Sequence, residues 1–241
     1  MNEVIKQINN RKSVRQYLKK DIQKEIKNVI LKSAIEAPSA GNQQLYTIID
    51  VENQDIKERL SVLCDNQPFI KDASMVLVFC SDYKKWYDLY KYGQCKPRYL
   101  AKGDFLLSVT DTMIAAQNTV VAAESFGVGS CYIGDILENY EDIKELLNLP
   151  QNVVPVTMIV YGYPTEKQIN RKKPTRPSVD VIVHKDKYTE LKDEKLRDLV
   201  EHELNKVEFE KWIKAFCERK YNSEFSKEMD RSVKKYLEEF K

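Results

Sequence analysis

The spacing of hydrophobic residues changes several times along the chain, and a helical spacing appears first. Between residues 22 and 36, apolar side chains recur every three or four positions, which predicts a helix with one buried face. Asp21 precedes this stretch as a candidate N-cap, and Pro38 follows it as a stop signal. The same reasoning predicts helices over residues 4–9, 55–64 and 140–147.

Short runs of β-branched and apolar residues predict strands over residues 46–51, 75–81, 130–133 and 153–161. Helices and strands alternate irregularly, so we expect an α/β (α+β) fold in which helices flank a mixed central sheet, and not a doubly wound sheet. Residues 82–103 are rich in aromatic side chains without a clear period. We expect this segment to be irregular, and its role stays open.

Residues 104–126 form the most apolar predicted helix. Beyond its first residue, only Asp111 and Glu124 carry charge. A helix that is apolar nearly all round is buried on all sides. It is either a plain core helix or the centre of a subunit interface, and we favour the interface.

From Lys185 to Lys241 the composition changes to densely mixed charge, which is typical of solvated helices with internal ion pairs. We therefore predict a main domain over residues 1–190. Residues 191–241 are predicted to be a helical C-terminal extension that packs on the same domain or on a dimer partner.

The charge balance excludes several partners. The 241 residues include 39 Lys and Arg and 37 Asp and Glu, a net charge of +2, which gives no overall attraction to nucleic acid or an acidic membrane. The longest apolar run, residues 75–80, is far shorter than the roughly 18 residues of a spanning helix. The N-terminus does not resemble a signal peptide, so we expect a cytoplasmic protein.

Few side chains are suited to direct catalysis. The five cysteines contain no C-x-x-C pair, which argues against disulfides and structural zinc; we expect Cys80 and Cys131 to be core residues. Only two histidines are present, and we predict no metal site. Motifs of P-loop ATPases and α/β-hydrolases are missing, and residues 127–129 do not form a Rossmann fingerprint. A cofactor that carries its own chemistry fits this composition.

Two cationic segments are candidates for binding a phosphate. Residues 11–15 place two arginines, a lysine and a serine together, and residues 167–176 form a basic, proline-containing loop. Taken alone, the first segment is better explained as a basic helix end and the second as a solvated loop. Together with the turn at residues 37–43, they favour a phosphorylated cofactor.

The sequence resembles the flavin-dependent nitroreductase family, nearest to its branch of NAD(P)H-dependent nitroreductases and flavin reductase P. Six stretches match in family order: residues 11–15, 37–43, 65–69, 117–118 with 122–129, 131–134 and 173–177. The resemblance covers residues 1 to about 190. It implies a nitroreductase-like three-layer sandwich and a homodimer that binds FMN at the subunit interface.

The resemblance also assigns candidate residues. It implies that the FMN phosphate is held by Arg11, Lys12 and Ser13, with Lys173 and Arg176 from the second cluster. Ser39 and Asn42 would come from the turn, across the dimer. Around the flavin ring, the implied contacts are Gln67 at the pyrimidine edge, Arg15 beside N1 and O2, the Gly134 N–H near N5, and the neighbouring Tyr132 and Ile133.

The implied activity is a flavin oxidoreductase. It takes hydride from NADH or NADPH and reduces nitroaromatics, quinones, azo compounds or free flavin by a ping-pong mechanism. No side chain is expected to be catalytic itself; Arg15 and Gly134 would tune the flavin. The partners would be small-molecule electron acceptors.

Two alternatives stay open: a flavin-binding redox sensor or regulatory module with little turnover, and a related chemistry such as reductive dehalogenation. Asp135 departs from the family pattern, which often has a second glycine there. Arg219 falls near a position at which the branch contacts the nicotinamide cofactor's phosphate.

Overall fold

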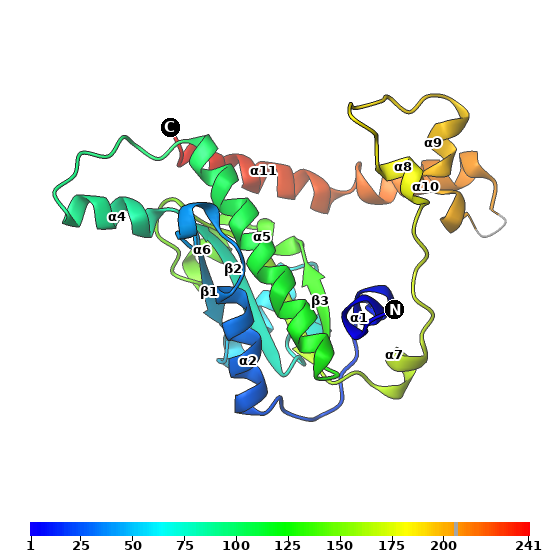
Figure 1. Ribbon diagram of the computed structural model, residues 1–241, viewed down its shortest axis with the longest axis horizontal. Helices are drawn as coiled ribbons and strands as arrows, with labels where there is room; N and C mark the ends of the chain where they lie inside the picture. The colour runs from blue at the N-terminus through cyan, green and yellow to red at the C-terminus, as the bar shows by residue number, and fades with distance from the viewer. Residues whose placement is uncertain (205–206) are drawn as a thin grey trace. The chain divides into compact units, whose positions relative to one another are not determined.

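The computed structural model describes residues 1–204 and 207–241, which divide into two compact units (Figure 1). The first comprises Met1–Arg171 and Glu228–Lys241, and the second comprises Lys172–Lys227. The two units are defined by contacts in space. The predicted division into a main domain of residues 1–190 and an extension of residues 191–241 stays a prediction. Among the described residues, no helix is both long and apolar enough to cross a bilayer.

A sheet of four antiparallel strands forms the centre of the first unit, in the order β1-β2-β4-β3. The strands are β1 (Tyr46–Asp50), β2 (Met75–Asp82), β3 (Gly129–Ile133) and β4 (Val153–Gly162). The predicted strands are confirmed within one residue at each end. The sheet is less mixed than expected, because parallel pairing within the described residues is confined to an isolated bridge between Ser13 and Ser130.

Helices cover both faces of this sheet and give the three layers that were predicted (Figure 1). On one face, α2 (Lys24–Ile35) and α5 (Lys102–Ser125) pack against strand residues such as Phe79. On the other, α3 (Gln54–Leu63) and α6 (Tyr140–Leu146) pack against residues such as Met158. Cys80 and Cys131 are buried in this second layer, as predicted.

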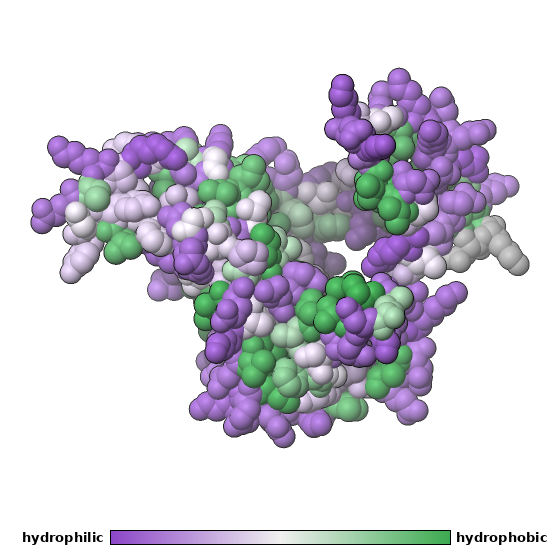
Figure 2. Space-filling model, in the orientation of Figure 1, coloured by the Kyte–Doolittle hydropathy of each residue, from purple (hydrophilic) through white to green (hydrophobic). Residues whose placement is uncertain are grey.

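The long helix α5 is not buried on all sides within one chain, which argues against a plain core helix, and its place in a subunit interface stays a prediction. Its inner face carries small residues, including Ala115 and Ala116, that let it lie close to the sheet. Its outer face exposes Leu106, Leu107, Met113 and Ile114. The adjoining helix α1 (Glu3–Asn10) has no buried residue. Hydrophobic side chains gather over both helices in Figure 2.

Two further local predictions were wrong. Residues 82–103 contain a helix, α4 (Lys84–Tyr92), which is anchored where Trp86 Nε1 donates to the carbonyl oxygen of Gln43 at 2.7 Å. The N-cap of α2 is Gln23 and not Asp21, and no side chain caps that helix. For α4, a contact made in the folded chain overrides the local signal.

The C-terminal helix α11 (Glu224–Glu238) begins in the second unit and continues into the first. Near its end, Tyr236 and Phe240 are buried with Leu100 and Val154. The second unit contains α8 (Val179–Ile182), α9 (Glu194–Asp198) and α10 (Phe209–Lys220). The remaining elements are α7 (Glu166–Asn170) and the 3₁₀ turns η1 (Ala40–Asn42), η2 (Pro68–Ile70), η3 (Asp135–Leu137) and η4 (Glu201–Glu203).

Candidate functional site

The candidate site is built on an extended segment that crosses the ends of β3 and β4. The Val14 N–H donates to the Ser130 carbonyl at 2.9 Å. Two glycines, paired across the strands, make room for the segment. A Cβ on Gly129 would lie 2.5 Å from Cγ2 of Val14, and one on Gly162 would lie 2.6 Å from Cδ1 of Tyr17. Glycine is therefore required at both positions.

Lys12 and Arg171 tie this segment to the chain after β4. The Lys12 ammonium donates to the carbonyl oxygens of Ile169 at 2.6 Å and Arg171 at 2.5 Å. The Arg171 guanidinium in turn donates to the carbonyl oxygen of Ser13. Of the three hydrogens of Lys12, a predicted phosphate ligand, one remains for a ligand.

Arg11 and Arg15 supply the positive charge of the site. Arg11 is the C-cap of α1, and its buried Nη1 has no hydrogen-bond partner among the described residues. Such a group is costly to bury unless a ligand completes it. The exposed Arg15 guanidinium lies 5.9 Å from the centre of the Phe69 ring. Burial raises the pKa of the nearby Glu124, and the charges of Arg11 and Lys12 oppose that rise.

Gln67 lies on a turn after α3, two residues before Phe69, whose ring lies near Arg15. Asp65 and Asn66 reach it through left-handed backbone, with φ of 60° and 51°. Its side-chain Nε2 donates to the Cys64 carbonyl oxygen at 2.8 Å and to Asp135 Oδ2 at 2.7 Å. The amide is thereby held on two sides.

Tyr132, Ile133 and Gly134 mark the end of β3. Ile133 points into the core, so only its backbone can serve a ligand. The Tyr132 hydroxyl donates to Gln117 Oε1 at 3.1 Å, and burial raises the pKa of Tyr132 to about 12. Gly134 is exposed, and a Cβ built there would meet no atom within 4 Å. The backbone at Gly134 thus borders open space.

Ser39 and Asn42 lie on a separate turn around η1. Their side-chain oxygens both accept from Gln44 Nε2, at 3.2 and 2.9 Å. The Asp111 carboxylate of α5 fixes the turn by accepting from the Ala40 N–H at 3.0 Å. Within the described part of the chain, the hydrogen bonds of this turn lead to α4 and α5, and not to the cationic segment.

Lys173 and Arg176 belong to the second unit. Arg176 Nη1 donates to the neighbouring Thr175 carbonyl at 3.1 Å, and Thr175 Oγ1 donates to the His202 carbonyl at 2.8 Å. Arg219, on α10, places its guanidinium 5.3 Å from the Phe216 ring centre. Their roles stay predictions.

Sequence reasoning missed two buried polar residues beside the site. Gln168 is 7% exposed, and its Oε1 accepts from the Arg15 N–H at 3.3 Å. Glu138 is 5% exposed, and its Oε1 has no hydrogen-bond partner within the described residues. Burial, together with the charge of Asp135, raises the pKa of Glu138 to about 7. No local sequence motif predicts a role for either residue.

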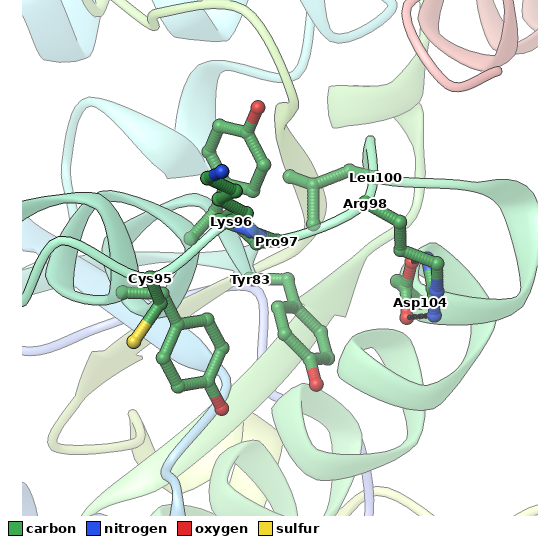
Figure 3. A pocket seen from close by; sticks show the side chains of 9 residues that line it. Tyr83, Cys95, Lys96, Pro97, Arg98, Leu100 and Asp104 are labelled. Carbon is green, nitrogen blue, oxygen red and sulfur yellow. Dashed lines mark hydrogen bonds and ion pairs between the residues drawn. The ribbon is translucent and has the colours of Figure 1, made fainter.

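A separate cavity of about 290 Å³ lies between α4 and the start of α5 (Figure 3). Its lining is Tyr83, Tyr87, Tyr90, Cys95, Lys96, Pro97, Arg98, Leu100 and Asp104. Arg98 spans to the Asp104 carboxylate with two hydrogen bonds, which neutralises its charge. The aromatic segment of residues 82–103 thus lines most of a cavity.

The donors of the site fit a planar aromatic group that bears a phosphate. Arg11 Nη1, which has no hydrogen-bond partner in the described part of the chain, Lys12 and the exposed Arg15 are suited to an anion. The Gln67 amide, the Phe69 ring and the exposed Gly134 are suited to a flat group. The class of protein that this fold and site fit is one that binds a phosphorylated aromatic cofactor on a three-layer sandwich.

Comparison with known proteins names the family. The profile of the nitroreductase family matches residues 8–163, and the chain belongs to this family. It is 33% identical over 190 residues to "FMN reductase (NADPH)" of Bacillus subtilis, covering 78% of this chain and 75% of that protein. It is 30% identical over 237 residues to "FMN reductase [NAD(P)H]" of the same organism, covering 92% and 93%. The solved structure of NfrA1 nitroreductase from B. subtilis superposes with a TM-score of 0.82 at 27% identity, covering 98% of each chain.

Proposed function

We propose that this protein is an FMN-dependent oxidoreductase that takes hydride from NADH or NADPH and reduces nitroaromatics, quinones or free flavin by a ping-pong mechanism. The observation that carries the proposal is the buried Nη1 of Arg11, which has no hydrogen-bond partner among residues 1–204 and 207–241, on a segment that also contains Lys12 and Arg15. The names of the two Bacillus relatives support FMN and a nicotinamide donor.

FMN, when bound, supplies the hydride-accepting and electron-donating chemistry. Arg11, Lys12 and Ser13 bind its phosphate, assisted by Lys173 and Arg176. Arg15 places positive charge beside the pyrimidine ring, where it stabilises negative charge that develops during reduction. Gln67 binds the pyrimidine edge.

The remaining residues shape the site. Tyr132 and Ile133 line it, and Gly134 keeps space open for the ring and a second substrate, as its unobstructed Cβ position supports. Ser39 and Asn42 act from the second subunit, because their turn hydrogen-bonds away from the cationic segment of its own chain.

The working form is a homodimer. The helix α5 exposes Leu106, Leu107, Met113 and Ile114, and the neighbouring α1 exposes Val4, Ile5 and Ile8; exposed apolar patches of this kind mark interaction sites. A second copy of the chain covers these residues and brings the turn with Ser39 and Asn42 to the partner's cofactor. All five cysteines are free thiols, which supports the reducing cytoplasm as the compartment.

The first experiment is the visible absorption spectrum of the purified protein, followed by addition of NADH or NADPH without air. Flavin bands that bleach with one donor support the oxidoreductase and identify its donor. Flavin bands that persist with both donors favour the flavin-binding sensor or regulatory module. A protein without flavin that fails to bind added FMN overturns the proposal.

A further inference from the structure

The contact between Gln67 and Asp135 limits what Gln67 can offer a ligand. An amide nitrogen carries two hydrogens, and those of Gln67 Nε2 are directed to the Cys64 carbonyl oxygen at 2.8 Å and to Asp135 Oδ2 at 2.7 Å. A carbonyl oxygen and an ionised carboxylate only accept. If the amide of Gln67 were flipped, its oxygen would face the Cys64 carbonyl oxygen and Asp135 Oδ2. Repulsion between these oxygens therefore fixes the orientation of the amide.

The surroundings hold both partners in place. Cys64 is the C-cap of α3, and Gln67 itself donates its backbone N–H to the Ser61 carbonyl at 2.8 Å. Asp135 is the first residue of η3, and its carbonyl accepts from the Glu138 N–H at 3.1 Å. Two turns from different parts of the chain thus meet at one amide.

We propose that Asp135 is a positioning residue that holds Gln67 with its carbonyl oxygen toward the cofactor, so that Gln67 accepts a hydrogen bond from the N3–H of the flavin. This inference rests on the proposed function, because it concerns the cofactor proposed there. It adds a role for a residue at which this chain departs from its family's usual glycine. With both hydrogens committed, Gln67 does not donate to a flavin carbonyl.

The test compares two variants of Asp135 by fluorescence titration of the apoprotein with FMN. Asp135→Asn removes the charge but keeps an oxygen that accepts from Gln67, and we expect a dissociation constant within about threefold of the wild type. Asp135→Ala removes the acceptor, frees one hydrogen of Nε2 and lets the amide rotate. We expect FMN to bind about fivefold to tenfold more weakly, the effect of one hydrogen bond.

A vibrational spectrum of the bound flavin reports the same contact independently of affinity and turnover. In Asp135→Ala, the freed N–H donates to a flavin carbonyl and lowers its stretching frequency, whereas Asp135→Asn leaves the frequency unchanged. Equal weakening in the two variants means that Asp135 acts through its charge, and the inference is overturned. Unchanged affinity and an unchanged carbonyl band in Asp135→Ala overturn it as well.

The N3–H proton of the bound flavin gives a second route that does not depend on the alanine variant folding. In proton NMR of the wild type and of Asp135→Asn, both loaded with FMN, we expect this proton to resonate downfield of free FMN and to exchange slowly with water, because the Gln67 carbonyl oxygen accepts from it. In Gln67→Leu, whose fold is checked by circular dichroism, we expect both effects to be lost. If the proton behaves in the same way in the wild type and in Gln67→Leu, Gln67 does not accept from N3–H and the inference is overturned. A wild-type protein that binds no FMN overturns the proposed function itself, and this inference with it.

Discussion

At the scale of single residues, the site depends on the absence of side chains at Gly129 and Gly162. Without side chains there, the segment from Val14 to Tyr17 lies directly on the ends of β3 and β4. Arg15 is presented outward from this rigid support, beside Phe69. A cation held in this way acts at a defined place and loses little conformational entropy on binding an anion.

Arg15→Ala is expected to weaken FMN binding by about tenfold or more, because a charge-assisted contact is worth roughly 1.5–3 kcal/mol. The measurement is the FMN dissociation constant together with the rate at which NAD(P)H reduces the bound flavin. Arg15→Lys keeps the charge and recovers part of the loss, and Lys19→Ala is the matched control on the same exposed segment. If affinity and reduction rate are both unchanged in Arg15→Ala, the residue does not belong to the site.

Glu138 makes stability depend on pH. Burial raises its pKa to about 7, with the charges of Asp135, Asp65 and Glu228 contributing. The folded state therefore holds this proton more tightly than the unfolded state. The free energy of unfolding falls as pH rises from about 4.5 to 7 and stays lower above that range.

Glu138→Gln removes this titration. We expect the variant to match the wild type near pH 4.5 and to be more stable by roughly 3 kcal/mol at pH 8, as measured by urea unfolding. Glu145→Gln, at an exposed position on α6, is the control and should show no such difference. A stability difference between Glu138→Gln and the wild type that is the same at both pH values would falsify the assignment.

At the scale of elements, the end of the chain after α11 is fixed by one buried carboxylate. Glu239 accepts from the Tyr140 hydroxyl at 2.7 Å and from the Asn152 N–H at 2.6 Å, and it pairs with the Lys144 ammonium. Its side chain is 8% exposed. This group joins the chain terminus to α6 and to the turn before β4.

Glu239→Ala is expected to lower the free energy of unfolding by about 3 kcal/mol, because it leaves the Lys144 charge partly buried without its partner. Asp230→Ala, which removes the exposed pair of Asp230 with Lys234 on α11, is expected to cost no more than about 0.5 kcal/mol. Chemical denaturation of both variants makes the comparison. Equal costs would show that the Glu239 cluster does not hold the terminus.

The elements show which parts of the fold the sequence can predict. Periodic segments such as α2, and β-branched runs such as β2 and β4, were found because burial of one face or of both leaves a local pattern. Helix α4 was missed because its aromatic residues have low helix propensity and its anchor is the remote Gln43 carbonyl.

The same distinction between local sequence patterns and contacts in the folded chain applies to the site. Arg11 and Arg15 stand in a cationic run that is visible in the sequence. The carbonyl groups that occupy Lys12 come from Ile169 and Arg171, far along the chain, and no local pattern announces them. Gln168 and the partner of Gln67 were hidden for the same reason: they act through contacts that exist only in the folded chain.

At the scale of the whole molecule, the homodimer proposed above rests on the apolar face of α5. Leu106 and Ile114 are 64% and 41% exposed in one chain, on a helix whose opposite face is fully buried. Covering such side chains stabilises a dimer by roughly 1.5–3 kcal/mol for each one fully buried.

The double variant Leu106→Lys/Ile114→Lys is expected to be monomeric in analytical ultracentrifugation and to lose FMN, because the turn with Ser39 and Asn42 no longer reaches a partner's site. Val62→Lys, at an exposed apolar position on α3 outside this face, is the control and should leave the dimer intact. A double variant that remains dimeric places the interface elsewhere.

The return of the last residues to the first unit has a consequence for synthesis on the ribosome. Phe240 is buried there, and the Lys241 N–H donates to the Leu100 carbonyl at 3.1 Å. Residues 1–171 leave the ribosome before these residues do, so this unit completes its core only after residue 240 has emerged from the exit tunnel. A premature stop codon before Phe240 therefore removes a core residue from a unit that is otherwise almost fully synthesised.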